Sequence, residues 1–223
     1  MRVLALDFDG VISDSAPESF AVALETYLDA VPGSRLATDR PAVVGDGRGS
    51  GSLSAIRSHP LYAAFLEAMP LGNRAEDFGV VLRALDQRQP LPDQAHYDAF
   101  RATLTQRWLD DFHRSFYARR ADFARRDPEG WRALLAPYPE FIRLLRTRGQ
   151  RVVLAIATAK DRPSVERLLA DYAIDDLFPP DRVLDKETGV HKSDHIRALG
   201  RPRARGPAPA GELDLLTNET GDD

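Results

Sequence analysis

An unbroken apolar run from Val152 to Thr158 constrains the fold more than any other feature of this 223-residue chain. Apolar and polar residues do not alternate in it, so the run predicts a strand that is buried on both faces. Val3 to Leu6 is a second run of this kind, and residues 182–184 form a weaker third one. Helical patterns lie on both sides of the Val152 run. The sequence therefore predicts an α/β fold with a Rossmann-like parallel sheet and crossover helices.

A long helical region separates the first predicted strand from the other two. Apolar residues recur at helical spacing in three parts of it, which contain Phe20 to Leu28, Phe78 to Leu85 and Tyr97 to Phe116. The third part predicts one helix from about Asp93 to Arg126, with Pro128 as its end. Before the second part, Asn73 and Glu76 have the spacing of a capping box.

This order of patterns predicts an inserted domain. We expect an α/β core formed by residues 1–15 and 137–200, with residues 16–136 inserted as a large α-helical cap. Residues 201–211 are only Arg, Pro, Ala and Gly. Such a segment can bury little apolar surface, so residues 201–223 are expected to be a disordered or truncated tail.

The composition is that of a globular protein, and it argues against several functions. Hydrophobic residues make up 43% of the chain and charged residues 29%. The 30 Lys and Arg residues are outnumbered by 34 Asp and Glu residues, so no general basic field favours nucleic acid or a membrane surface. The chain has no cysteine, which excludes disulfides, thiolate metal sites and a cysteine nucleophile.

The N-terminal run is too short for a signal peptide, because Asp7 and Asp9 interrupt it. No window approaches the roughly 20 apolar residues of a membrane span. We therefore expect a cytoplasmic protein.

Two carboxylates, Asp7 and Asp9, directly follow the first predicted strand. Open parallel sheets build their sites at the carboxyl ends of their strands. One carboxylate can attack phosphorus and form an aspartyl-phosphate, and a second acid can protonate the leaving oxygen and later deprotonate water. The same pair can help to hold Mg²⁺, which binds one or two carboxylates together with phosphate oxygens and water. Asp7 and Asp9 are therefore predicted as catalytic and metal-binding residues.

The segment from Asp7 to Ser15, Asp-Phe-Asp-Gly-Val-Ile-Ser-Asp-Ser, resembles the first motif of the haloacid dehalogenase (HAD) superfamily, most of whose members are phosphatases. The resemblance implies that Asp7 is the nucleophile and Asp9 the general acid and base, with the Asp9 backbone carbonyl on magnesium. The dehalogenases that name the family do not keep an acid two residues after the nucleophile. This chain keeps Asp9, which favours phosphate-ester chemistry.

Two further positions match motifs of the same family. Thr158, at the end of the predicted second strand, resembles the Thr or Ser that hydrogen-bonds the phosphoryl group. Lys192 resembles the lysine that neutralises charge on that group, and Lys186 is the rival for this role. A helix that Ser193 is expected to cap would begin beside Lys192 and favour an anion through its backbone amides.

The family's fourth motif, an apolar strand followed by paired acids that complete the magnesium site, is not recognisable. Asp222 and Asp223 lie at a suitable distance but follow a polar segment, and Glu212 and Asp214 flank only a short apolar stretch. In the family fold this strand pairs with the first strand. Without it, Val3 to Leu6 is expected to be an apolar edge strand, which favours aggregation.

The resemblance implies magnesium-dependent hydrolysis of a small phosphorylated metabolite through an aspartyl-phosphate. A phosphomutase would share every residue named so far. A truncated, non-catalytic remnant would account for the missing fourth motif. The sequence leaves these alternatives and the oligomeric state open.

Overall fold

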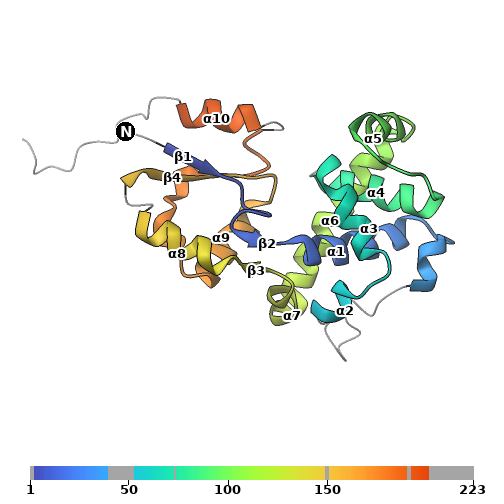
Figure 1. Ribbon diagram of the computed structural model, residues 1–223, viewed down its shortest axis with the longest axis horizontal. Helices are drawn as coiled ribbons and strands as arrows, with labels where there is room; N and C mark the ends of the chain where they lie inside the picture. The colour runs from blue at the N-terminus through green and yellow to red at the C-terminus, as the bar shows by residue number, and fades with distance from the viewer. Residues whose placement is uncertain (1–2, 40–52, 73, 149–150, 190–191, 201–223) are drawn as a thin grey trace, which may run out of the picture.

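The computed structural model describes residues 3–39, 53–72, 74–148, 151–189 and 192–200, and they form a mixed α/β structure (Figure 1). Its main sheet has three parallel strands in the order β1-β4-β5, with bounds Val3–Leu6, Val153–Ala157 and Val183–Leu184. The strands predicted at these positions are therefore confirmed. The predicted burial of the first strand on both faces is wrong, because Val3, Leu4 and Ala5 are exposed. The Val3 to Val153 pairing sets the register of β1 on β4.

Helices cover both faces of the sheet. In Figure 1, α10 (Lys192–Gly200) lies on one side of the strands, and α8 (Pro139–Arg148) and α9 (Arg162–Asp171) lie on the other. This explains the unbroken apolar sequence of β4, because Leu154, Ala155 and Ile156 are all buried. Ser193 lies inside α10, so its prediction as the residue that caps this helix is wrong.

The region between β1 and the rest of the sheet is helical. It forms a separate body beside the sheet in Figure 1, built from α1 (Ala16–Ala30), α2 (Leu53–Arg57), α3 (Tyr62–Ala68), α4 (Ala75–Gln87), α5 (Gln94–Arg101), α6 (Gln106–Arg126) and α7 (Pro128–Ala133). Short 3-10 helices are found at Arg35–Asp39, Met69–Leu71, Asp175–Leu177 and Pro180–Arg182.

A row of buried phenylalanines packs the helical body. The rings of Phe20, Phe65, Phe78 and Phe116 come from α1, α3, α4 and α6, and the centroids of neighbouring rings lie 5.2, 5.7 and 5.7 Å apart. Edge-on and tilted contacts of this kind add to the free energy of burying the rings. Phe20, Phe78 and Phe116 belong to the apolar patterns that predicted helices, whereas Phe65 and its helix α3 lie outside those patterns.

A short antiparallel pair joins the helical body to the sheet. β2 (Ser13–Asp14) pairs with β3 (Ala136–Pro137), and the Tyr138 amide donates to the Ile12 carbonyl at 3.0 Å. The chain thus leaves the core and returns to it through one pair of strands. These strands lie close to residues 16 and 136, and the division of the chain into a core and an inserted cap stays a prediction.

The helix predicted from about Asp93 to Arg126 has both of its predicted ends, but it is interrupted in its interior. The single helix from Asp93 to Arg126 is two helices, α5 and α6, because the Thr105 hydroxyl caps a new helix by accepting from the Trp108 amide at 3.2 Å. Pro128 opens the next helix, α7, where proline is favoured in the first turn.

The capping residue of α4 is also not the predicted one. Asp77, not Glu76, accepts from a backbone amide at the helix start, that of Arg74, at 3.1 Å. Glu76 instead contacts His113 of α6. Asn73 lies outside the described residues.

Strand β1 has only β4 as a neighbour among the described residues, and its Val3 and Leu4 side chains are 40% and 43% exposed. The expected tail, residues 201–223, lies outside the described residues, so its state stays a prediction. None of the described helices combines the length and apolar character that crossing a bilayer requires.

Candidate active site

The loop that follows β1 carries Asp7 and Asp9. It turns sharply because the Phe8 carbonyl accepts from the Ile12 and Ser13 amides at 2.9 and 3.1 Å. Gly10 stands in the turn at φ +75°, a conformation that side chains with a Cβ rarely adopt. Phe8 and Ile12 are fully buried and anchor the loop, so Asp7 and Asp9 are presented at the edge of the sheet.

The Asp7 carboxylate is oriented by the backbone. Its Oδ1 accepts from the Phe8 amide at 2.8 Å. A carboxylate held in this way does not have to lose side-chain entropy when it meets a substrate.

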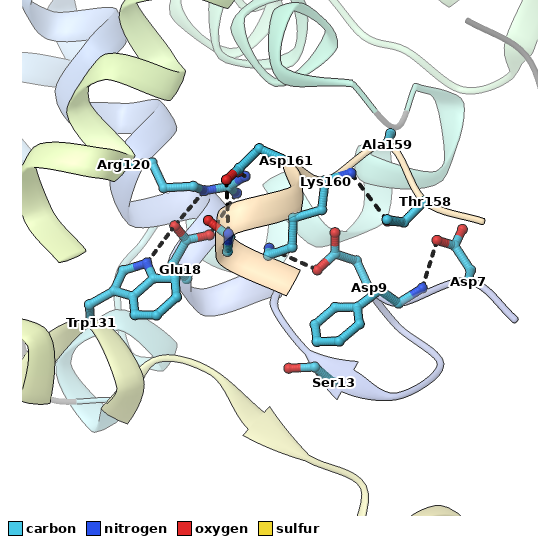
Figure 2. Close-up of polar contacts among 12 residues, drawn as sticks. Asp7, Asp9, Ser13, Glu18, Arg120, Trp131, Thr158, Ala159, Lys160 and Asp161 are labelled. Carbon is cyan, nitrogen blue, oxygen red and sulfur yellow. Dashed lines mark hydrogen bonds and ion pairs between the residues drawn. The ribbon is translucent and has the colours of Figure 1, made fainter. Parts of the chain in front are cut away.

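The loop that follows β4 brings Thr158 and Lys160 to the same edge. Thr158 is fully buried; its amide donates to the Leu184 carbonyl at 2.9 Å, and its hydroxyl accepts from the Lys160 amide at 3.1 Å. The Lys160 side chain is fully buried, and its Nζ lies 3.0 Å from Asp9 Oδ1 (Figure 2). Parallel neighbours place their carboxyl ends together, so the β1–β4 pairing makes this contact.

A buried ion pair in the helical body flanks this edge. Arg120 of α6 donates from Nε and Nη2 to the two oxygens of Glu18 on α1, both at 2.7 Å. Glu18 also accepts from the Trp131 indole at 3.2 Å, and Arg120 Nη1 lies 3.9 Å from Asp161 of the core (Figure 2). Arg120 is therefore a fixed cation with one charge partner, Glu18, in the helical body and another, Asp161, beside the sheet.

A cavity of about 200 Å³ lies between the sheet edge and the helices. Its polar side includes Asp7, Asp9, Thr158 and Lys160, and its opposite side is formed by helical residues that include Met69, Phe78, Phe116, Tyr117 and Arg120. Tyr117 also ties α6 to the core, because its hydroxyl donates to the Ala159 carbonyl at 2.9 Å.

Two cations control the charge of Asp9. Burial by itself raises the pKa of Asp9. The charges of Lys160 and Arg120, together with hydrogen bonding, lower it by more than burial raises it, so the pKa lies below its ordinary value of 3.8. Burial by itself lowers the pKa of Arg120, but Glu18 outweighs this effect and raises the pKa above its ordinary value. Burial also raises the pKa of Tyr117 to about 12, so its phenol stays protonated and can donate to Ala159.

The structure places some of the predicted site residues together and leaves others apart or undescribed. Asp7, Asp9 and Thr158 line one cavity. Lys192 is the first residue of α10, but its side chain lies outside what the structure describes. The rival Lys186 is not among the described residues that line the cavity; its Nζ lies 2.8 Å from Glu187 and 4.4 Å from the centre of the Tyr117 ring.

Sequence reasoning missed Lys160 and Arg120. Lys160 could have been found, because it follows the end of β4 by only a few residues and so had to lie near the same sheet edge as Thr158. Arg120 carried no comparable signal, because its partner Glu18 is 102 residues away in the sequence.

The carboxylates of Asp7 and Asp9 are suitable ligands for a hard cation such as Mg²⁺. No group of three or more His, Cys, Asp or Glu side chains among the described residues is arranged to hold a metal ion. The donors fit an ion that relies on one or two carboxylates and completes its shell with water and phosphate oxygens. They do not form a closed protein cage.

We compared the chain with protein-family models, curated proteins and solved structures, and none of them matches it.

Proposed function

We propose that this chain is a magnesium-dependent phosphomonoester hydrolase of the HAD type, with a Rossmann-like core and a helical cap. One observation carries the proposal: Asp7, Asp9 and Thr158, predicted from separate parts of the sequence, line one cavity at the carboxyl ends of β1 and β4. Fold likeness alone would not support an activity, but a nucleophile, an acid and a phosphate-binding hydroxyl in one cavity do.

The chemistry needs two steps. In the first step, an Asp7 oxygen attacks phosphorus and the bond from phosphorus to the ester oxygen breaks. That oxygen takes a proton from Asp9, which must itself first be protonated, because Lys160 and Arg120 hold the pKa of Asp9 below its ordinary value in the free site. In the second step, water attacks phosphorus and passes a proton to Asp9 while the bond from phosphorus to the Asp7 oxygen breaks. This step releases phosphate and restores the Asp7 carboxylate and the protonated Asp9 side chain. The Phe8 amide orients Asp7 for the attack.

Positive charge and hydrogen-bond donors around the phosphoryl group lower the barrier. Thr158 provides a hydroxyl at the cavity wall, and Lys192 would add a cation as the family resemblance implies. The Asp7 carboxylate and the Asp9 backbone carbonyl would hold Mg²⁺, as the family resemblance implies, and the ion neutralises charge on the phosphoryl oxygens when it is bound. The helical residues of the cavity would exclude bulk water from the reaction.

The size of the cavity favours a small substrate. Its volume of about 200 Å³ is below the range of roughly 300–1,000 Å³ that is usual for sites of drug-sized ligands. A compact phosphorylated metabolite fits this volume better than the sugar bisphosphate that a phosphomutase must hold. Product analysis with a sugar phosphate and its bisphosphate would distinguish the two activities.

The test is phosphate release from p-nitrophenyl phosphate with and without Mg²⁺. We expect turnover that EDTA abolishes and Mg²⁺ restores, and that Asp7→Asn lowers by more than about a thousandfold. Asp98→Asn, the same change on the exposed surface of α5, is the control and should leave the rate unchanged. A folded wild-type protein without any turnover would favour the non-catalytic alternative.

A further inference from the structure

Lys160 is a buried cation at the sheet edge, and the scheme above gives it no step of its own. Its side chain is fully buried, whereas the side chain of its partner Asp9 is 34% exposed. A buried lysine is costly unless it is paired. The Lys160–Asp9 contact is therefore a strong restraint on both groups.

Lys160 is itself held in place by its backbone. Its amide donates to the Thr158 hydroxyl at 3.1 Å, and its carbonyl accepts from the Lys186 amide at 3.2 Å. These hydrogen bonds tie the loop after β4, which contains Lys160, to the loop after β5, which contains Lys186. Asp9, by contrast, lies in a turn next to Gly10, where the backbone has a positive φ.

We infer that Lys160 is a positioning residue for Asp9: its ammonium group reaches across from the β4 loop and fixes the Asp9 carboxylate where it exchanges a proton with the bridging oxygen of the substrate. This inference rests on the proposed function. Lys160 acts here through Asp9 and not on the phosphoryl group. Proton transfer needs donor and acceptor atoms within hydrogen-bond distance, so an Asp9 side chain that is free to rotate loses most of its effect.

A comparison of leaving groups separates this role from a structural one. An alkyl phosphate expels a basic alkoxide and needs a proton from Asp9, whereas p-nitrophenolate leaves without one. Lys160→Met is expected to lower kcat/KM about a hundredfold for an alkyl phosphate and less than about fivefold for p-nitrophenyl phosphate. Lys160→Arg keeps the charge and should restore much of the alkyl phosphate activity.

Lys186→Met is the matched control, because Lys186 neighbours the same loop but contacts Tyr117 and Glu187. Any effect of this change should be the same for both substrates. Circular dichroism and thermal unfolding of each variant establish that it is folded.

An equal loss on both substrates in a folded Lys160→Met protein would overturn the inference, and would mean that Lys160 contacts the phosphoryl group directly. A gain on the alkyl phosphate would overturn it as well. If wild type hydrolyses neither substrate, the proposed function fails instead, so the two failures are distinguishable.

Discussion

At the scale of single residues, the Glu18–Arg120 pair has the largest predicted effect on stability. Glu18 is fully buried and the Arg120 side chain is only 4% exposed, so neither charge has water as an alternative partner. We expect Glu18→Gln to lower the free energy of unfolding by about 3–5 kcal/mol, because it leaves the Arg120 charge buried without its carboxylate. Urea denaturation followed by circular dichroism measures this change.

Glu140→Gln is the control for this prediction. Glu140 pairs with Arg143 on the surface of α8, where the two side chains are 81% and 70% exposed. Water and salt screen such a pair, so its removal should have little measurable effect. Equal effects of the two substitutions would contradict the importance that we assign to burial.

At the scale of elements, the contact between α4 and α6 predicts a dependence of stability on pH. Glu76 of α4 lies 2.7 Å from His113 Nδ1 of α6. Burial by itself raises the pKa of Glu76, but the hydrogen bond from His113 and the charges of His113 and Arg74 lower it below its ordinary value of 4.5. The stabilisation is thus present above the pKa of glutamate in the unfolded chain and is lost as pH falls through the lower pKa of the folded state.

Glu76→Gln is therefore expected to cost about 1–2 kcal/mol near pH 6 and much less near pH 3. Chemical denaturation of wild type and variant across this range measures the difference. Glu67→Gln on the exposed face of α3 should show no such trend. A penalty that does not change with pH would mean that shape and not charge explains the role of Glu76.

At the scale of the whole molecule, the β1 edge predicts self-association. Leu4 is 43% exposed on a strand that has one neighbour among the described residues. An apolar edge presents backbone groups to another chain, and a charged residue there prevents such pairing. Leu4→Lys should therefore lower the concentration-dependent increase in light scattering several-fold.

Leu66→Lys is the matched control, because Leu66 is 38% exposed but lies on α3, away from the sheet. It should change light scattering much less than Leu4→Lys. If both substitutions act alike, general surface hydrophobicity and not the strand edge causes the association.

Features that depend on neighbouring residues could be predicted from the sequence. The apolar runs predicted β1 and β4, and helical spacing predicted α1 and α4, because burial selects side chains with the period of the element. The same signal failed between α5 and α6. Leu104 continues the apolar pattern across the break, so only the Thr105 cap marks the new helix.

For the candidate site, local patterns predicted which groups follow the strands. Asp7, Asp9 and Thr158 come at the ends of apolar runs, and such a run indicates a strand through its own residues. The contacts that these groups make depend on the tertiary structure. The Lys160–Asp9 contact spans 151 residues and the Arg120–Glu18 contact spans 102. Such pairs depend on the register of β4 on β1 and on how α6 packs against α1, and packing of this kind leaves no periodic pattern in the chain.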